Sequence, residues 1–378
     1  MPRIRLFTPG PVMIPDEVLL EAAQPLEHHR TQVYQNLLKE VTAGLQYVFQ
    51  TSQPCITIAG SGTAGMEGAI VSCARPGRKV LTCDGGKFGE RWGKVCDAFG
   101  IERETYKIEW GRGAKAAKIA EYLAKDKSIG MVVVVYSETS TAAVSELEQI
   151  AKLTKDTDVL LVTDAITAAG AIPLKMDEWG VDVVVTGSQK ALMNPPGLAY
   201  AAIGKKAQDV IQSIKPKAFY LSYKAYLKSL ADNDAPYTPA ITLVRSTHKA
   251  LQMIKAEGIE KVWCRVSKLA RATRAAAEAI GLPVYAKDPV DSLTAILTPE
   301  SIKVSPLRKT LQTKYGVHVA DGQDELKGKV IRISHMGAVD EYEMLGAIGS
   351  LELTLKEMGH PFKLGAGLAA AQEVLAEG

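Results

Sequence analysis

The sequence lacks any large excess of one charge. Its 378 residues include 45 Lys and Arg against 42 Asp and Glu, which gives a formal net charge of +3. No block of like charges occurs, and basic residues are not interleaved with the aromatic ones, which make up 6% of the chain. Proteins that bind nucleic acid or anionic membranes carry such patterns. We therefore expect neither as a partner.

Long apolar runs are missing as well. No run approaches the roughly 20 residues that a membrane-spanning helix needs. The start, Met1-Pro2-Arg3-Ile4-Arg5, has no apolar block of the kind found in a signal peptide. We expect a cytoplasmic protein.

Metal-ligand spacings are also missing. The five cysteines are odd in number and far apart: Cys55, Cys73, Cys83, Cys96 and Cys264. No Cys-x-x-Cys or Cys/His pair occurs, and the only close histidines, His28 and His29, are adjacent and so face different directions on a helix. We expect mostly buried, apolar cysteines and no catalytic metal.

Apolar, β-branched runs alternate with helical patterns over the first 200 residues. Strands are predicted at 55–58, 80–83, 131–135, 159–163, 181–185 and 199–203, and helices at 33–49, 63–73, 88–99, 115–124 and 145–154. This alternation predicts an α/β fold with a mostly parallel sheet. Beyond residue 239, helical patterns at 241–257, 261–280 and 341–358 and strand patterns at 293–297 and 330–334 predict a smaller α+β domain. We divide the chain into an N-terminal segment (1–20), a large domain (21–258) and a small domain (259–378).

The turn after the predicted strand 181–185 carries a candidate nucleophile. Its sequence is Thr186-Gly187-Ser188-Gln189-Lys190. Open α/β sheets bind ligands at the carboxyl ends of their strands. A lysine that loses solvent there has a lowered pKa and can form a Schiff base with an aldehyde cofactor or a carbonyl substrate. A lysine in a turn is more often an exposed cap, so this motif needs support from a second one.

That support comes from Asp164, which ends the predicted strand 159–163. An isolated Asp at such a position is commonly a helix cap or a metal ligand. Together, Lys190 and Asp164 are the pair that pyridoxal phosphate needs, because the lysine holds the aldehyde as an imine and the carboxylate keeps the ring nitrogen protonated.

Two further motifs suit anions. Gly60-Ser61-Gly62-Thr63 joins a predicted strand to a predicted helix, where unpaired helix N–H groups can face a phosphate. Arg332 lies inside an apolar strand, so its guanidinium should meet a carboxylate. That carboxylate belongs either to a substrate or to an internal Asp or Glu.

With these motifs in this order, the chain resembles the class V aminotransferases of fold type I, and within them the alanine/serine:glyoxylate group. The resemblance covers nearly the whole chain. Its further motifs are Thr8-Pro9-Gly10-Pro11, Gln46-Tyr47-Val48-Phe49-Gln50-Thr51, Glu138-Thr139-Ser140-Thr141, Ala191-Leu192 after the lysine, Pro195-Pro196-Gly197 and Arg332-Ile333-Ser334.

The resemblance implies a seven-stranded, mostly parallel sheet domain, a smaller C-terminal domain and pyridoxal 5'-phosphate as cofactor. It implies catalytic roles for Lys190 and Asp164, and substrate binding by Arg332 and Gly10. The cofactor-binding residues would be Ser61, Gly62, Thr63, Phe88, Thr139, Asp164, Gln189, Lys190 and Thr238. Phe88 would stack on the ring, and Thr139 would lie near its phenolic oxygen.

The resemblance extends to Thr238, which matches a family threonine that completes the phosphate site of the partner subunit. The resemblance therefore implies a homodimer with a shared active site. A neighbouring family tyrosine is not matched, because Ala235 stands at its position; Tyr237 is a nearby replacement. His28, His29 and Arg30 form either part of a substrate pocket or a solvated patch.

The expected reaction moves the amino group of a small L-amino acid, alanine or serine, to glyoxylate or pyruvate by a ping-pong mechanism. The preferred pair of substrates is left open. One alternative is a cysteine desulfurase-like lyase, although the mobile nucleophilic cysteine of such an enzyme has no clear counterpart here. Another is a non-catalytic hydrogenase-type subunit, since some relatives carry that label.

Overall fold

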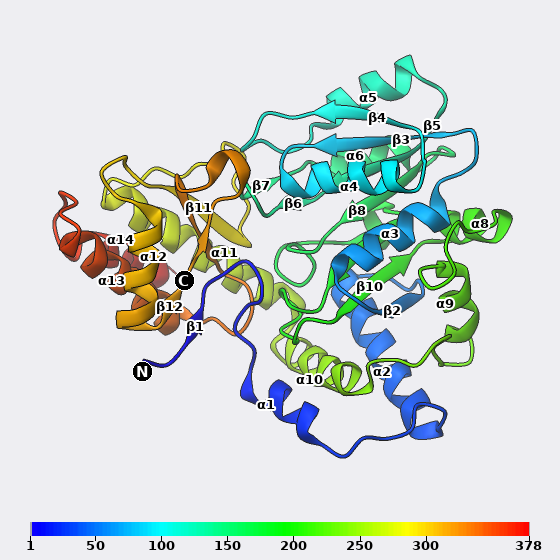
Figure 1. Cartoon of the computed structure of the whole chain (residues 1–378), viewed down its shortest axis with the longest axis horizontal. Helices are drawn as coiled ribbons and strands as arrows, with labels where there is room; N and C mark the ends of the chain where they lie inside the picture. Colours follow the sequence, from blue (N-terminus) through cyan, green and yellow to red (C-terminus); the bar gives the residue numbers. More distant parts are fainter. Residues whose placement is uncertain (1, 378) are drawn as a thin grey trace.

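A seven-stranded sheet forms the centre of the larger part of the molecule (Figure 1). In this computed structural model, which describes residues 2–377, the strand order is β2-β10-β9-β8-β5-β3-β4. The strands are β2 (Cys55–Ala59), β3 (Lys79–Asp84), β4 (Arg103–Lys107), β5 (Ile129–Val135), β8 (Leu160–Asp164), β9 (Val183–Gly187) and β10 (Leu198–Ile203). Only β10 runs antiparallel to its neighbours, β2 and β9. The predicted mostly parallel sheet is thus confirmed.

Both faces of this sheet are buried. Successive residues of a strand point to opposite faces. In β5, Val132 and Val134 pack in one apolar cluster, whereas Met131 and Val133 pack in another. The first cluster includes residues of α2 (Gln32–Phe49), α5 (Ala116–Lys125), α6 (Leu147–Thr154) and α10 (Ile241–Glu257). The second includes residues of α3 (Gly62–Cys73), α4 (Lys87–Ala98), α8 (Lys205–Ser213) and α9 (Tyr223–Leu230). Helices therefore cover the sheet from both sides.

A second, three-stranded sheet lies in the C-terminal part of the chain. Its order is β11 (Leu293–Leu297), β14 (Val330–Ser334), β13 (Ala320–Asp321). It packs with α11 (Ile259–Ala279), α12 (Val304–Thr310), α13 (Glu341–Glu357) and α14 (Ala366–Ala376). The shorter elements are α1 (Asp16–Leu20), η1 (Glu21–Ala23), β6 (Ser137–Glu138), β7 (Ala143–Val144), α7 (Met176–Trp179), η2 (Leu311–Tyr315) and η3 (Asp324–Leu326).

The start of the chain is built into this C-terminal part (Figure 1). β1 (Arg5–Leu6) pairs in parallel with β12 (Val317–His318). The carbonyl of Phe7 then accepts a hydrogen bond from the Ser334 N–H at 2.7 Å. The three-way division of the chain at residues 20 and 258 stays a prediction.

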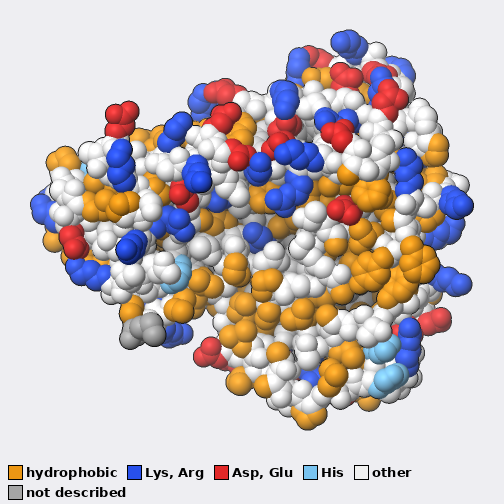
Figure 2. Space-filling view, viewed as in Figure 1, with side chains coloured by type: hydrophobic (Ala, Val, Ile, Leu, Met, Phe, Trp, Pro, Cys, Tyr) orange, Lys and Arg blue, Asp and Glu red, His pale blue; other side chains and the backbone are white. Residues whose placement is uncertain are grey.

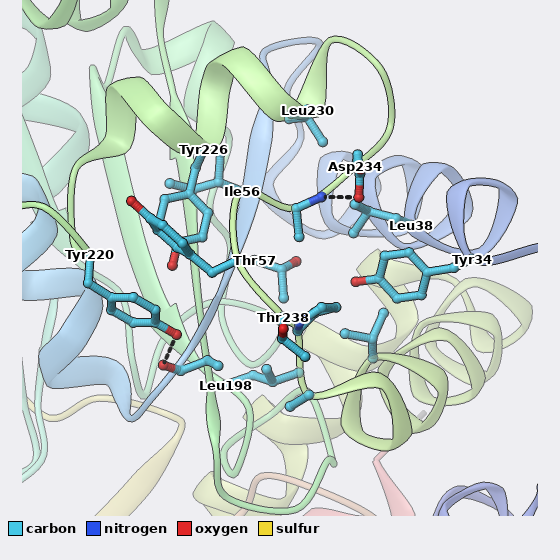
Figure 3. Close-up of a pocket in the computed structure, with 16 residues that line it drawn as sticks. Tyr34, Leu38, Ile56, Thr57, Leu198, Tyr220, Tyr226, Leu230, Asp234 and Thr238 are labelled. Carbon is cyan, nitrogen blue, oxygen red and sulfur yellow. Dashed lines mark hydrogen bonds between the residues drawn. The ribbon is translucent and has the colours of Figure 1, made fainter. Parts of the chain in front are cut away.

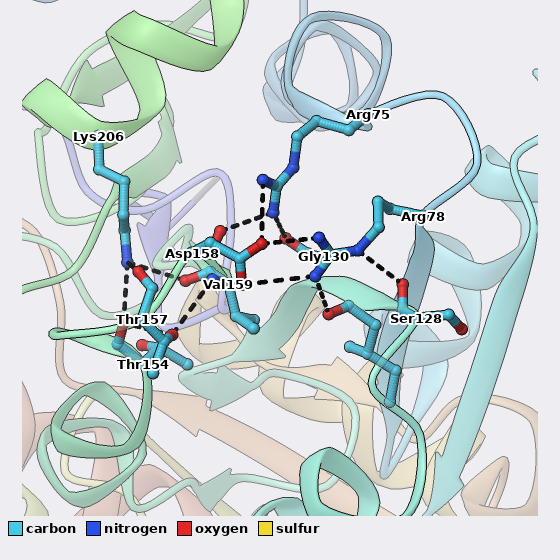
Figure 4. A network of polar contacts seen from close by, with 10 residues as sticks. Arg75, Arg78, Ser128, Gly130, Thr154, Thr157, Asp158, Val159 and Lys206 are labelled. Atoms are coloured by element: carbon cyan, nitrogen blue, oxygen red, sulfur yellow. Dashed lines mark hydrogen bonds and ion pairs between the residues drawn. The ribbon is translucent and has the colours of Figure 1, made fainter.

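Hydrogen bonds and ion pairs form a network at the amino ends of the strands (Figure 4). Lys190 follows the carboxyl end of β9 and so lies at the opposite edge of the sheet. Arg78 pairs with Asp158 and also donates to the carbonyls of Ser128 and Ile129. Lys206 donates to the carbonyls of Thr154, Thr157 and Val159. These contacts join the starts of β3, β5 and β8 and give the large sheet a rigid base.

The C-terminal helix α14 depends on a buried carboxylate. Glu352 of α13 is 1% exposed and accepts the N–H groups of Gly365, Gly367 and Leu368 at 2.7, 2.6 and 3.1 Å. These are the otherwise unpaired donors at the start of a helix.

We expect Glu352→Ala to lower the free energy of unfolding by about 2–3 kcal/mol, because three buried donors lose a charged acceptor. Urea denaturation measures this change, and hydrogen exchange reports whether α14 is the part that opens. Glu373→Ala, at an exposed position of α14 itself, is the matched control and should change stability by less than about 0.5 kcal/mol. Equal effects of the two substitutions would contradict the capping role.

Candidate active site

The candidate nucleophile lies buried where two neighbouring strands end. β8 and β9 pair in parallel; β8 ends at Asp164, and the chain continues from β9 into the turn that carries Lys190. Lys190 is 8% exposed, and its Nζ donates to the Pro9 carbonyl at 2.6 Å. The structure thus brings the predicted acid and amine to one edge of the sheet and adds the N-terminal loop to them.

This environment changes the ionisation of Lys190. Burial is the main cause that lowers the pKa of its amine to about 8, with the positive charges of Arg332 and Arg91 in the same direction and Asp164 opposed to them. An amine that is neutral at mildly alkaline pH is a competent nucleophile and base.

Asp164 is held in a fixed orientation. It is 2% exposed; its Oδ2 accepts the Trp92 indole N–H at 3.1 Å, and its Oδ1 accepts the Ile166 backbone N–H at 3.0 Å. Burial raises the pKa of this carboxyl, while the two hydrogen bonds and the charges of Arg91 and Lys190 lower it. A carboxylate has about four acceptor positions, so it retains capacity for another donor.

The predicted phosphate cradle lies at the start of α3. Ser61 is the N-cap of this 12-residue helix, and Gly62 and Thr63 begin its first turn. A Cβ on Gly62 would lie 2.6 Å from Ile166 Cδ1, so a larger residue here would require the Ile166 side chain to move. Among residues 2–377, the buried Oε1 of Gln189 has no hydrogen-bond partner, and a Cβ on Gly187 would lie 3.2 Å from it and 3.6 Å from the Gly62 N. An unsatisfied polar atom beside a helix N-terminus suits a bound polar group.

Thr139 begins a chain of buried hydroxyl groups. Its Oγ1 lies 3.0 Å from Thr167 Oγ1, which donates to Ser137 Oγ at 2.9 Å; Ser137 Oγ lies 3.1 Å from Ser292 Oγ. Ser292 directly precedes β11, so the chain of hydroxyls crosses from the large sheet to the C-terminal part. The predicted residue is Thr139; the other three were not predicted.

Arg332 has only carbonyl partners. It is 6% exposed; its Nη1 donates to the Thr139 carbonyl at 2.8 Å and its Nε to the Asp321 carbonyl at 2.9 Å. Within residues 2–377, no carboxylate oxygen lies within 4.0 Å of its guanidinium, and burial lowers the pKa of Arg332 to about 10. A buried guanidinium without an internal carboxylate partner is suited to bind an incoming one.

Gly10 contacts the nucleophile. Its φ is +148°, and a Cβ there would lie 2.2 Å from Lys190 Nζ. The Thr8 hydroxyl bonds the Pro11 carbonyl and so closes this loop. The N-terminal loop therefore covers Lys190, and only a residue without a side chain is accommodated at its closest point.

Helix α4 supplies three side chains to the site, of which Phe88 alone was predicted. Trp92 bonds Asp164, and Arg91 Nη1 donates to Thr63 Oγ1 at 3.3 Å. The Arg91 guanidinium carbon lies 4.7 Å from the centre of the Phe88 ring. Positions i, i+3 and i+4 share one face of a helix. That spacing, counted from Phe88, is the signal in the sequence that would have identified Arg91 and Trp92.

Glu138 anchors the start of α4 and was also missed as a site residue. It is 5% exposed, and its Oε2 accepts the N–H groups of Phe88 and Gly89 at 3.1 and 3.0 Å. Burial raises the pKa of this carboxyl, and its hydrogen bonds to Ser140 and Gly89 lower it. Its position in the predicted Glu138-Thr139 motif, ahead of a helix start, was the available signal.

Thr238 is not brought to Lys190 within one chain. It lines a cavity of about 20 Å³ with Tyr34, Thr57 and Tyr226, and this cavity shares no lining residue with the Lys190 site (Figure 3). That volume suits a single water. Tyr237 donates to the Phe219 carbonyl at 3.1 Å.

The His28 to Arg30 segment lies against the loop that carries Thr238. Arg30 pairs with Asp234 and donates to the Ala235 carbonyl at 3.1 Å. The rings of His28 and His29 stack with centroids 4.8 Å apart. Arg30 therefore supports the loop rather than standing as a free surface charge.

Cysteines and possible metal ligands are scattered. Four cysteines are buried and Cys264 is exposed on α11. Burial raises the pKa of the Cys96 thiol to about 12 and raises those of Cys55, Cys73 and Cys83 further. In the described part of the chain, no three His, Cys, Asp or Glu side chains cluster as metal ligands would, and no helix is long and apolar enough to cross a bilayer.

The arrangement of lysine, aspartate and arginine can be compared with known proteins. The family model of the class-V aminotransferases matches residues 4–340. The chain belongs to this family. A soluble hydrogenase small subunit of Synechococcus sp. is 37% identical over 376 residues, with 98% of both chains covered. A serine–glyoxylate aminotransferase of Hyphomicrobium methylovorum is 35% identical, with 97% of this chain and 93% of the relative covered.

A solved aminotransferase structure shares the fold of this chain. The ureidoglycine–glyoxylate aminotransferase of Bacillus subtilis superposes with a TM-score of 0.93 at 26% identity and covers 99% of this chain and 98% of its own. The predicted fold type I is confirmed by this likeness and by the large, mostly parallel sheet.

The lowered pKa of Lys190 is testable by its reactivity. Reductive methylation of Lys190 in cofactor-free protein should rise through pH 8 and level off above it, because the neutral amine reacts and its pKa is about 8. Ordinary lysines should continue to gain reactivity up to a pKa of about 10.4. Peptide mass spectrometry at a series of pH values measures both.

Arg332→Gln tests whether the charge of Arg332 contributes to the lowered pKa of Lys190. Removal of this positive charge stabilises the ammonium form, so the half-point for Lys190 should move to higher pH. A half-point that stays near 10 in the unaltered protein would show that the amine is not desolvated.

Proposed function

We propose that this protein is a pyridoxal 5'-phosphate-dependent transaminase that moves the amino group of a small L-amino acid, alanine or serine, to glyoxylate or pyruvate by a ping-pong mechanism. The observation that carries the proposal is the buried amine of Lys190, with its lowered pKa, at the strand ends that also carry Asp164. When bound, the cofactor supplies an aldehyde that accepts amino groups and a ring that delocalises negative charge.

The residues present fit this cofactor at three points. The start of α3, with Ser61, Gly62 and Thr63, offers backbone donors to the phosphate. Gln189 adds a buried polar group with an unsatisfied oxygen beside that cradle. The third point is Arg332, a buried cation whose charge a substrate carboxylate would balance.

Side chains of this protein supply proton transfer, support of the cofactor ring and substrate binding. Lys190 Nζ would take the proton from the substrate's Cα and deliver it to the C4′ carbon of the cofactor, since a neutral amine close to its target is an effective base. Asp164 holds the proton on the ring nitrogen, and Trp92 and Ile166 fix the carboxylate that does so. Arg332 binds the substrate carboxylate, and the loop at Gly10 excludes water above Lys190.

The choice of small substrates is supported by this loop and by the relatives. Pro9 and Gly10 lie in contact with Lys190 and leave little room beside its amine. Two of the similar proteins described above carry glyoxylate in their names. Alanine and serine as donors and glyoxylate or pyruvate as acceptor remain proposals for this chain.

We also propose a homodimer in which Thr238 completes the partner's site. Large apolar side chains are exposed from the end of α1 to the start of α2 and after α8; these are Leu20 (63%), Leu26 (70%), Val33 (57%) and Phe219 (81%). Figure 2 shows apolar side chains gathered across the lower part of the face that it displays, where α1, α2 and α9 lie in Figure 1. Such a surface suits burial against a second copy. The cytoplasmic location stays a prediction.

A non-enzymatic role is the second candidate, because one similar protein is named as a hydrogenase subunit. An enzyme is favoured by three buried ionisable groups around one site, Lys190, Asp164 and Arg332. Their burial costs free energy, and such groups with shifted pKa values are typical of active sites. A desulfurase-like lyase would need a mobile cysteine, and Cys264 lies within the 21-residue helix α11.

The visible spectrum of the purified protein distinguishes these candidates. We expect a visible absorption band from cofactor joined to Lys190, its loss on addition of L-alanine or L-serine, and its return with glyoxylate or pyruvate. L-Aspartate serves as the comparison donor. Lys190→Ala should keep the fold and lose steady-state transamination. A protein that binds no cofactor would overturn the proposal, and one whose band no donor changes would point to a lyase or a non-catalytic role.

Arg332→Gln should raise the KM for L-alanine about 100-fold, because a buried charge pair with the carboxylate is lost. Arg332→Lys should restore part of the affinity. Arg308→Gln is the matched control, since Arg308 is 40% exposed on the neighbouring helix α12. Ethylamine lacks the carboxylate, so Arg332→Gln and Arg308→Gln should react with it equally slowly. Rates measured over pH 7–9 show whether a change in the Lys190 pKa contributes to the effect. If ethylamine and alanine lose reactivity by the same factor, Arg332 does not bind the carboxylate.

A further inference from the structure

One cation of the site has no role in the reaction described above. Arg91 lies on the inner face of α4, half-buried, one turn after Phe88. In the described chain no carboxylate oxygen approaches its guanidinium within the 4.0 Å of an ion pair, although Glu90, the residue before it, pairs with Lys87 and Lys94 on the outer side of the helix. A half-buried guanidinium without an anion is an incomplete arrangement.

The contacts of Arg91 direct its guanidinium toward the first turn of α3. Nη1 donates to Thr63 Oγ1 at 3.3 Å, and the guanidinium carbon stands 4.7 Å from the centre of the Phe88 ring. Thr63 belongs to the first turn of α3, where backbone N–H groups are unpaired. Arg91 has five N–H donors, of which Thr63 uses one. Arg91 is therefore held over the helix end that suits an anion.

The charge of Arg91 also acts on the catalytic groups. It helps to lower the pKa of Lys190 and opposes the rise in the pKa of Asp164. Its field therefore reaches the site, and an anion bound at α3 would be attracted by both the helix end and the guanidinium.

We propose that Arg91 binds the phosphate group of pyridoxal phosphate and supplies the positive charge at that end of the cofactor site. This inference rests on the proposed function. A second anion, the side-chain carboxylate of an acidic donor, is the competing ligand. The geometry favours phosphate, because Arg91 is bonded to the first turn of α3, whereas Arg332 is bonded to Thr139 and Asp321 and is free to take a substrate carboxylate.

Binding of two aldehydes tests the proposal without turnover. Pyridoxal phosphate and pyridoxal are titrated into cofactor-free protein in a phosphate-free buffer, and the dissociation constants are read from absorbance. Arg91→Gln should weaken pyridoxal phosphate at least about tenfold, as expected for loss of a charge-assisted hydrogen bond, and should change pyridoxal less than twofold. Arg91→Lys should lie between the two, since it keeps the charge and loses the planar fork.

Lys94→Gln is the matched control. It removes the same charge from α4, but its side chain is 63% exposed and pairs with Glu90 on the outer side of the helix, so it should leave both constants unchanged. Circular dichroism melting checks that each variant is folded. The three variants together separate a local contact from the general charge of the helix.

Three outcomes would overturn the assignment. Equal weakening of pyridoxal and pyridoxal phosphate would place Arg91 at the ring or at Asp164. Unchanged affinity for both would show that it is not a ligand. Unchanged affinity with a raised KM for L-aspartate alone would assign it to the donor's side chain. Failure of the unaltered protein to bind either aldehyde at Lys190 would instead refute the proposed function.

Discussion

Desolvation of the Lys190 amine is the constraint on which the site depends. The amine lies at the end of the large sheet and donates to the Pro9 carbonyl, and its burial, together with the charges of Arg332 and Arg91, lowers its pKa. The charge of Asp164, a buried carboxylate, opposes this lowering. The tight loop at Gly10 and the fixed carboxylate at Asp164 therefore belong to one electrostatic arrangement.

Helix α4 concentrates several functions in little more than one turn. Its start is capped by Glu138, its first turn carries Phe88, and the following residues reach Thr63 and Asp164. A rotation of this helix by one residue would remove all of these contacts together. The buried cap explains how a helix at the edge of the site keeps its side chains in register.

The sequence predicted the strands with continuous apolar runs and the residues at their ends, because both are local patterns. Lys190 and Asp164 lie at one edge of the sheet for that reason. β4 (Arg103–Lys107) was missed, since it is an edge strand in which only Tyr106 is buried. The hydroxyl groups of Thr167 and Ser292 were missed because their partners lie 28 and 155 residues away. Local periodicity does not specify such pairs.

The pairing of β1 with β12 affects the order in which the site forms during folding. Arg5 pairs with Val317, and the neighbouring residues up to Met13 bond partners as far along the chain as Ala338. Contacts between segments so far apart in the sequence form slowly, because the entropy of closing the loop opposes them. The Pro9–Gly10 loop is therefore held over Lys190 only after the C-terminal part has folded, and the desolvated amine is a late product of folding.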